Sequence, residues 1–207
     1  MKQAELQNIN LPSRYFEGHA ELYNRKIDDL GYIGQTRTDG TAKTTGLLTH
    51  GWATDAAAAT AEASTGPALY NEISDLIIRQ WTGVLNVESY KADHVVMPSR
   101  VYNVCTSKIL NTAGSEMSVL KALQANYPGM TFGMTTKADT VANGGNLAAS
   151  TVVAFSGNRR AMQMRIPVPL NVSSVDQRGF KYFVESFFAV AGLDVIETDA
   201  AQTLTGL

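Results

Sequence analysis

The fold class is decided by the stretch Arg178-Gly-Phe-Lys-Tyr-Phe-Val-Glu-Ser-Phe-Phe-Ala-Val-Ala-Gly-Leu-Asp-Val-Ile-Glu197. Aromatic and β-branched residues at short spacing are typical of β-strands, and Gly192 divides the stretch into a long strand and a second, short strand. Three adjacent apolar pairs leave no consistently polar side: Tyr182-Phe183, Phe187-Phe188 and Val195-Ile196. We therefore expect a sheet that is covered on both faces or by a neighbouring subunit.

The composition describes a folded protein with a surface that is poor in charge. The chain has 207 residues, of which 44% are hydrophobic and 17% are charged, so it can bury a substantial core as one domain or as two joined lobes. A formal net charge of -2 lacks the basic excess that drives sequence-independent binding to nucleic acid. Disordered chains and strongly basic nucleic-acid binders are therefore excluded.

Cysteine content and hydropathy favour neither secretion nor membrane insertion. Cys105 is the single cysteine, so no internal disulfide can form and no oxidising compartment is required. The N-terminal residues have no apolar core of a signal peptide, and no stretch reaches the roughly 20 apolar residues that span a bilayer. We expect no membrane partner and no cofactor.

Two amphipathic helices are predicted in the first half of the chain. Ser13 is expected to cap the first helix, which should end at Gly31. Its apolar residues recur at steps of three and four and form one narrow stripe: Phe16, Ala20, Tyr23, Ile27 and Leu30. Gly66-Pro67 predicts the start of the second helix, whose buried face carries Leu69, Ile73, Leu76, Ile77 and Trp81.

The middle of the chain interleaves strands, helices and loops. The run from Ala53 to Thr65 is mostly alanine and threonine, which is typical of a solvated connector or a short helical turn. His94 to Met97 predicts a buried strand, and residues 137–150 predict a mobile loop around two adjacent glycines. This order favours an α+β fold, in which a compact lobe is flanked by a second lobe built from both chain ends.

A catalytic or metal site has little support in the sequence. The histidines, His19, His50 and His94, are far apart and lack the spacing that would place two nitrogens on one helical face. Cys105 with His94 and Asp93 could form a thiolate-imidazole-carboxylate site, but a buried and inert cysteine is the preferred interpretation. An α+β enzyme with a Cys105/His94 site is kept as an alternative function.

One basic group stands out in the sequence. Arg159, Arg160 and Arg165 form the only concentration of positive charge. No aromatic residues accompany them as a stacking platform for bases, so we interpret them as interface or strand-edge residues in preference to a nucleic-acid site.

Several short motifs follow one another in a recognisable order. They are a helix at 13–30, Gly46-Leu47-Leu48, Gly66-Pro67 before Glu72-Ile73-Ser74-Asp75-Leu76, Ala92-Asp93-His94-Val95-Val96-Met97-Pro98, and strands at 160–169 and 178–207. This order resembles the major capsid proteins of tailed bacteriophages, whose Hong Kong 97-like fold is shared with encapsulin shells. The first helix matches the spine helix of that family, which implies that its apolar stripe lies against the sheet containing Phe183 and Phe187.

The resemblance implies a division into an axial and a peripheral domain. Residues 1–65 would form the spine helix and the approach to the peripheral domain, residues 66–155 the axial domain, and residues 156–207 the return to the peripheral domain. Most of the family's N-terminal arm and extended loop would be missing from this chain. Loops of the axial domain would gather at a symmetry axis, which makes Lys137, Asn143, Gly144, Gly145 and Asn146 candidates for subunit contacts together with the three arginines.

The function implied is that of a structural shell subunit without catalytic activity. Copies would associate into pentamers and hexamers of an icosahedral head that encloses the phage genome, assembled in the bacterial host cytoplasm. Further expected partners are scaffold or decoration proteins, and the genome through non-specific contacts on the shell interior. Two alternatives are an encapsulin-like cargo shell and a binding module that uses the 137–150 loop.

Overall fold

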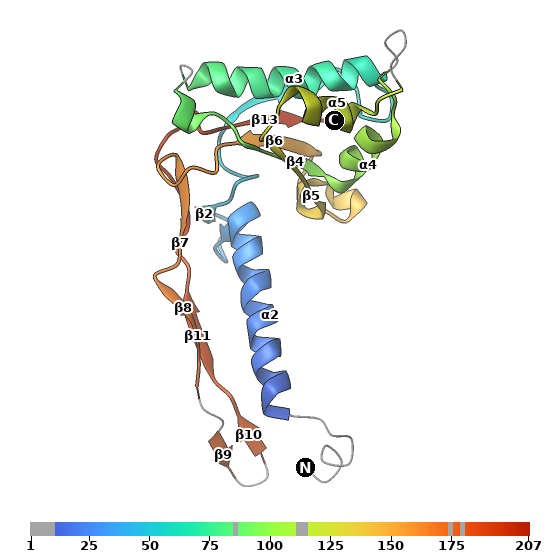
Figure 1. Cartoon of the computed structure of the whole chain (residues 1–207). Coiled ribbons are helices and arrows are strands. Elements are labelled where there is room, and N and C mark those ends of the chain that lie inside the picture. The colour runs from blue at the N-terminus through green and yellow to red at the C-terminus, as the bar shows by residue number, and fades with distance from the viewer. Residues whose placement is uncertain (1–10, 85–86, 111–115, 174–175, 179–180) are drawn as a thin grey trace. The chain divides into compact units, whose positions relative to one another are not determined.

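The computed structural model describes residues 11–84, 87–110, 116–173, 176–178 and 181–207 (Figure 1). Contacts along the chain divide it into two units. The first unit comprises Met1–Gly46 and Met164–Leu193, and the second comprises Leu47–Gln163 and Asp194–Leu207. Each unit contains helices and strands, so the predicted α+β class is confirmed.

The second unit contains a five-stranded mixed sheet with the strand order β3-β13-β6-β4-β5. The strands are β3 (Ala53–Ala56), β13 (Ala201–Thr205), β6 (Thr151–Phe155), β4 (His94–Pro98) and β5 (Thr131–Thr135). β13 pairs parallel with β3 and antiparallel with β6, and β4 pairs antiparallel with β6 and parallel with β5. The sheet therefore joins segments from the beginning, middle and end of the second unit.

The segment Ala53 to Thr65, which was predicted to be a solvated connector, contributes the edge strand β3 instead. Its pairing with β13 is reinforced by a hydrogen bond of 2.6 Å between the Thr54 and Thr203 hydroxyls. Alanine and threonine bury little apolar area, but a strand at the edge of a sheet needs to pair with only one other strand. Because β3 and β13 belong to one sheet, residues 47–65 and 194–207 lie in the same unit as residues 66–155, which differs from the expected boundaries.

Helix α3 (Gly66–Gly83) runs along the sheet of the second unit, as Figure 1 shows. The Thr65 hydroxyl caps its start by accepting a hydrogen bond from the Ala68 amide, and Pro67 occupies the first turn, where its missing N–H costs no hydrogen bond. The predicted face is confirmed for Leu69, Ile73, Leu76 and Ile77, which are fully buried, whereas Trp81 is only half-buried. They pack in one core with side chains of the sheet and of α4 (Ser99–Ser107) and α5 (Val119–Asn126).

Three short 3-10 helices complete the second unit: η1 (Glu88–Tyr90), η2 (Thr136–Ala138) and η3 (Val141–Asn143). The last two lie in the segment between β5 and β6, where the sequence predicted a mobile loop. Backbone hydrogen bonds close this segment on itself, from the Leu147 amide to the Asp139 carbonyl and from the Val141 amide to the Leu147 carbonyl. The segment is therefore a folded turn structure.

The first unit consists of one long helix and several two-stranded ladders. Its elements are α2 (Leu11–Tyr32), β1 (Gly34–Thr36) paired with β2 (Ala42–Thr45), β8 (Val168–Val172) paired with β11 (Ser186–Ala189), and β9 (Asp176–Arg178) paired with β10 (Lys181–Phe183). A further ladder pairs β7 (Met162–Arg165) with β12 (Gly192–Val195), and both of these strands are divided between the two units.

The C-terminal stretch forms more strands than the sequence predicted. A long strand and one short strand were expected, whereas the structure has β10, β11 and β12 in the quoted stretch, followed by β13. The register shifts between Phe187 and Ala189, which interrupts the ladder. Gly192 has φ +92°, and a side chain there would also meet Thr44, so only glycine fits this bend between strands.

Helix α2 begins at Leu11, so Ser13 lies inside the helix, and the prediction that Ser13 is its cap is wrong. Pro12 falls in the first turn, where proline is tolerated. The stripe is buried unevenly, since Leu30 is 5% exposed, Tyr23 and Ile27 are half-buried and Phe16 is 39% exposed.

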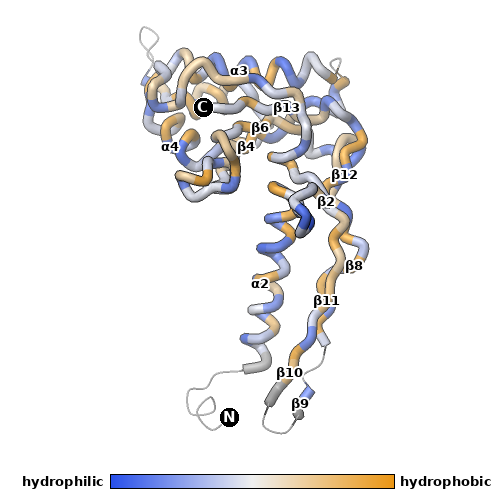
Figure 2. Tube along the Cα trace, turned by 180° about the vertical axis from the view of Figure 1, so that it is seen from behind, coloured by the Kyte–Doolittle hydropathy of each residue, from blue (hydrophilic) through white to orange (hydrophobic). Residues whose placement is uncertain are grey.

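Contacts between α2 and the β8–β11 ladder involve partly different residues from those expected. Tyr23 packs edge-on against Phe188 with ring centroids 5.0 Å apart, and His19 Nδ1 forms a hydrogen bond of 2.9 Å with the Ser186 hydroxyl. Phe187, which was predicted to face the helix, is exposed. Figure 2 shows hydrophobic and hydrophilic residues alternating along α2 and hydrophobic residues along β8 and β11.

We predict that Leu30→Ala lowers the free energy of unfolding by about 2–5 kcal/mol, because it removes a buried side chain at the end of the stripe. The matched control is Leu22→Ala on the same helix, where the side chain is 65% exposed and the change should stay within about 0.5 kcal/mol. Denaturant titrations at low protein concentration measure both. Equal losses in the two variants would show that the buried end of α2 does not stabilise the first unit.

Candidate functional site

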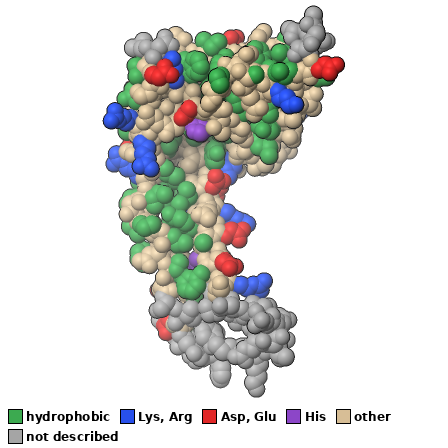
Figure 3. All heavy atoms as spheres, viewed as in Figure 1, with side chains coloured by type: hydrophobic (Ala, Val, Ile, Leu, Met, Phe, Trp, Pro, Cys, Tyr) green, Lys and Arg blue, Asp and Glu red, His purple; other side chains and the backbone are tan. Residues whose placement is uncertain are grey.

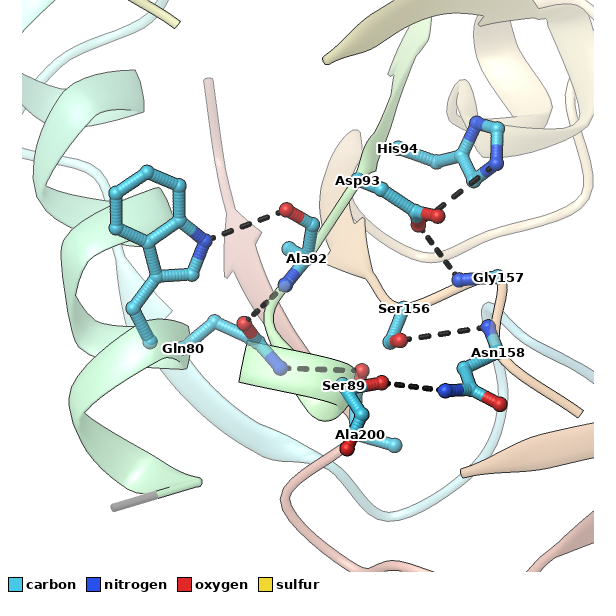
Figure 4. A network of polar contacts seen from close by, with 10 residues as sticks. Gln80, Ser89, Ala92, Asp93, His94, Ser156, Gly157, Asn158 and Ala200 are labelled. Carbon is cyan, nitrogen blue, oxygen red and sulfur yellow. Dashed lines mark hydrogen bonds and ion pairs between the residues drawn. The ribbon is translucent and has the colours of Figure 1, made fainter. Parts of the chain in front are cut away.

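A buried glutamine joins three segments of the second unit (Figure 4). Gln80 on α3 is fully buried, and the two N–H groups of its Nε2 are shared among the carbonyls of Tyr90, Asp199 and Ala200 at 3.0, 3.1 and 3.3 Å. Its Oε1 accepts a hydrogen bond of 2.7 Å from the Ala92 amide. One side chain thus satisfies backbone groups both before β4 and before β13.

The turn between β6 and β7 is shaped by two further polar side chains (Figure 4). The Asp93 carboxylate accepts a hydrogen bond of 2.6 Å from the Gly157 amide. Asn158 donates to the Ser89 carbonyl at 2.7 Å, and its Oδ1 accepts from the Arg160 amide at 2.9 Å. A side chain at position 157 would meet the His94 ring at 2.9 Å, so glycine allows the turn to lie against His94.

This turn presents two of the three predicted arginines. Arg159 and Arg160 are exposed, and neither guanidinium has a partner among the described residues. By contrast, Arg79 and Arg100 form ion pairs with carboxylates of their own unit. Arg165 is exposed on β7 and belongs to the first unit.

The predicted contact residues of the 137–150 segment lie on its turns. Lys137 is in η2, Asn143 ends η3, and Gly144 follows with φ 82° in the left-handed region. Gly145 is packed against backbone, because a side chain there would meet the Asp139 carbonyl oxygen at 2.1 Å. Asn143 and Asn146 are exposed, as is Val141. The segment can therefore present side chains from a defined backbone.

The first unit exposes aromatic and aliphatic side chains on both α2 and the β8–β11 ladder. The exposed residues are Tyr15, Phe16, Leu22, Phe183, Phe187 and Phe188, and we call this set the aromatic surface. Figure 3 shows hydrophobic side chains gathered over this part of the chain. Exposed aromatic and aliphatic side chains of this kind are enriched at contacts with other molecules.

The Cys105/His94 alternative is not supported by the geometry. Cys105 is completely buried in the core of the second unit, where burial raises the pKa of its thiol to about 12 even though nearby Lys108 lowers it. The thiol therefore stays protonated near neutral pH. His94 stacks on Phe155 with centroids 5.3 Å apart, and its Nε2 lies 3.7 Å from Asp93. Cys105 and His94 thus have separate surroundings.

A surface hollow of about 440 Å³ lies beside Trp81, Lys91 and Tyr127. The Lys91 ammonium lies 5.3 Å from the centre of the Trp81 ring and 2.9 Å from Glu88, while Tyr127 packs edge-on against Trp81. The Lys91 charge is therefore balanced within this hollow by Glu88 and the Trp81 ring. Within the described ranges, no group of three or more histidine, cysteine or acidic residues could hold a metal ion, and no helix is long and apolar enough to cross a membrane.

Comparison with known proteins assigns the fold to a family. The model of the major capsid protein family matches residues 1–207. The chain belongs to the major capsid protein family. It is 68% identical to a chain in the structure of the capsid of Myoviridae phage XM1, with a TM-score of 0.88, covering 100% of this chain and 68% of that chain.

More distant structures share the fold. A chain in the capsid of an empty GTA particle is 17% identical with a TM-score of 0.59, covering 96% of this chain and 67% of that chain. A chain of Mycobacterium phage Ogopogo is 12% identical with a TM-score of 0.54, covering 99% and 70%. The comparison with curated proteins gave no match. Hence the predicted Hong Kong 97-like fold and the predicted role as a phage shell subunit are confirmed.

The sequence analysis missed Gln80 as the residue that organises the second unit. A signal was present, because residue 80 follows Ile73 by seven positions and Ile77 by three, which places it on the buried face of α3. A glutamine on that face needs hydrogen-bond partners, and the backbone of two distant segments supplies them.

We predict that Gln80→Leu lowers the free energy of unfolding by about 2–4 kcal/mol, because buried backbone groups before β4 and β13 lose their partner. The control is Gln124→Leu, at an exposed position of α5, for which we expect a change within about 0.5 kcal/mol. Chemical denaturation followed by circular dichroism measures both variants. A Gln80→Leu protein as stable as the control would refute the organising role of this side chain.

Proposed function

We propose that copies of this major capsid protein associate as pentamers and hexamers and close an icosahedral head around the phage genome in the bacterial host cytoplasm. The observation that carries the proposal is the 68% identity, over the whole chain, to a chain of a phage capsid. The same observation favours a phage head over an encapsulin-like cargo shell. The burial of Cys105 agrees with a structural role without catalysis.

The aromatic surface of the first unit is the main candidate for subunit contacts. Leu22 and Phe187 are 65% and 59% exposed, so these two side chains contribute little burial free energy to the isolated subunit. Aromatic residues are enriched in the cores of protein interfaces, where they contribute much of the binding free energy. A neighbouring copy that covers this surface would also complete the coverage that the apolar stretch 182–196 requires.

The second unit supplies polar contacts in this proposal. We assign it to the axial region, with Lys137, Asn143, Gly144, Gly145 and Asn146 facing the same segment of neighbouring copies around a symmetry axis. The exposed Val141 in this segment supports that role, because it would be covered there. The first unit then corresponds to the peripheral domain.

Arg159 and Arg160 are assigned to an acidic partner, since their guanidinium groups have no partner in the described part of the chain. Arginine forms paired hydrogen bonds with carboxylates and phosphates. The partner is a neighbouring subunit in our proposal, while scaffold or decoration proteins and the packaged genome offer the same chemistry. Arg165 of the first unit is placed at a separate subunit contact.

We predict that Phe187→Ser leaves the thermal stability of the isolated subunit unchanged but weakens self-association at least about tenfold, equivalent to about 1.4 kcal/mol. The side chain is exposed in the subunit, so its loss should affect only the assembled state. Sedimentation velocity over a range of protein concentrations, together with electron microscopy of the products, measures the change.

The matched control is Ile78→Ser, which removes an exposed apolar side chain of α3 outside the aromatic surface. It should assemble like the original protein. Full assembly of Phe187→Ser would contradict the assignment of the aromatic surface, and failure of the original protein to associate at any concentration would contradict the proposed self-assembly.

A further inference from the structure

Asn143 and Gly144 form the only Asn-Gly pair in the sequence. The Cγ carbon of an asparagine lies near the backbone nitrogen of the next residue, and a bond between them closes a five-membered ring. Glycine has no side chain to hinder that approach, whereas every other asparagine of the chain precedes a bulkier residue. The covalent structure therefore holds an electrophilic carbon beside a potential nucleophile at this position.

The folded chain leaves this pair open to water. Asn143 is the last residue of η3, Gly144 follows with φ +82°, and both residues are exposed. The side-chain amide of Asn143 forms no hydrogen bond in the described part of the chain. A side chain at position 144 would meet nothing within 4 Å, so the space beside the glycine is open as well.

Other asparagines in turns of the second unit differ from Asn143. The side-chain amide of Asn158 is held by two backbone hydrogen bonds, one donated at 2.7 Å and one accepted at 2.9 Å. Asn146 is exposed, but it precedes Leu147, whose side chain hinders the approach to its backbone nitrogen. Asn143 thus combines an unhindered neighbour with an unrestrained side chain.

One hydrogen bond must open before the Gly144 nitrogen can react. Its N–H donates to the Val141 carbonyl at 3.2 Å. The amides on either side, those of Asn143 and Gly145, both donate to the Thr140 carbonyl at 2.9 Å. Bonds of the 3-10 type have poorer geometry than α-helical ones, and exposed backbone bonds open locally at low free-energy cost. The long bond of Gly144 is therefore a weak restraint.

We propose that Asn143 is a site of spontaneous deamidation. The Gly144 nitrogen gives its proton to water or hydroxide and attacks Asn143 Cγ, so that an N–Cγ bond forms, the Cγ–Nδ2 bond breaks and Nδ2 leaves as ammonia with a proton from water. Water then opens the resulting succinimide ring at either carbonyl carbon, which gives aspartate or isoaspartate. The net reaction consumes one water, releases one ammonia and needs no oxidant or reductant.

Deamidation would change the segment that faces a symmetry axis, a consequence that rests on the proposed function. Each modified copy gains one negative charge at position 143, and copies gathered around an axis would bring these like charges together. Isoaspartate also adds one carbon to the backbone, which alters the turn closed by the Thr140 carbonyl. Modified subunits would therefore assemble less well than fresh ones.

The test incubates the whole folded chain at neutral and at mildly alkaline pH and follows each asparagine by peptide mapping with mass spectrometry. The mass increase of an amide that becomes an acid should appear at Asn143 at least about tenfold faster than at Asn146 or Asn158, equivalent to a barrier lower by about 1.4 kcal/mol. The rate should rise with pH, because the attacking nitrogen must lose its proton. The product should contain isoaspartate, which direct hydrolysis of the side chain does not form.

Two variants control the measurement. Asn143→Gln should remain unmodified at position 143 over the same period, because attack on its longer side chain would have to close a six-membered ring. Asn146→Gln should deamidate at Asn143 at the rate of the original protein. Both positions are exposed, so neither change should disturb folding.

Two results would overturn the proposal. The first is an Asn143 that converts no faster than Asn146, which would mean that the hydrogen bond to Val141 holds the Gly144 nitrogen back. The second is a pH-independent conversion without isoaspartate, which would indicate direct hydrolysis. Neither result depends on whether the protein forms a shell.

The effect on assembly is measured separately by sedimentation velocity. Asn143→Asp should self-associate more weakly than the control Asn71→Asp, which adds the same charge at an exposed position of α3. Equal association of the two variants would refute the effect on assembly and leave the deamidation result unchanged.

Discussion

The pairing of β13 with β3 on one side and β6 on the other is the interaction on which the second unit depends. It joins strands that are about 150 and 50 positions apart in the chain, which is costly in loop-closure entropy. Further hydrogen bonds fix both flanks of the strand, because Ala57 donates to the Thr205 carbonyl and Gly206 donates to the Ser150 carbonyl, each at 2.8 Å. Gln80 then fastens the segment before β13 to α3, so helix and sheet share one core.

The two units differ in how completely their own residues bury apolar side chains and hydrogen-bond polar groups. In the second unit many large apolar side chains of α3, β4 and β6 are fully buried, among them Ile73, Met97 and Val152, and the buried Gln80 is hydrogen-bonded. The first unit has one helix and two-stranded ladders, which provide little buried area on their own. Several of its aromatic side chains are exposed, among them Phe16, Phe183 and Phe187. This contrast is what a subunit needs if it must be stable alone and must also bind its neighbours.

Local patterns in the sequence predicted the parts of the fold that depend on near neighbours. The buried face of α3 could be predicted because its apolar residues recur at steps of three and four, and the strand from His94 to Met97 could be predicted from its continuous apolar run. The position of β3 could not, since its alanines and threonines gain their partner only through β13, far along the chain. Phe188, and not Phe187, contacts Tyr23 of α2, and the sequence pattern could not decide between these two adjacent residues.

The candidate site was predicted in the same incomplete way. Arg159, Arg160 and Arg165 were predicted as contact residues because charge is sparse in this chain, and the division of β7 between the units, which assigns Arg165 to the first unit, could not be predicted from the sequence. The segment 137–150 was expected to be mobile because of its glycines, whereas Gly145 is required by close backbone packing.

The central claim is that this chain is a shell subunit whose exposed aromatic surface and free arginines are covered by neighbouring molecules. A cryo-electron microscopy reconstruction of the assembled particle that contains this chain tests it most directly. The account predicts Leu22 and Phe187 against another subunit, and Arg159 and Arg160 within hydrogen-bond distance of carboxylate or phosphate oxygens. A particle in which all four side chains face bulk solvent would contradict the account.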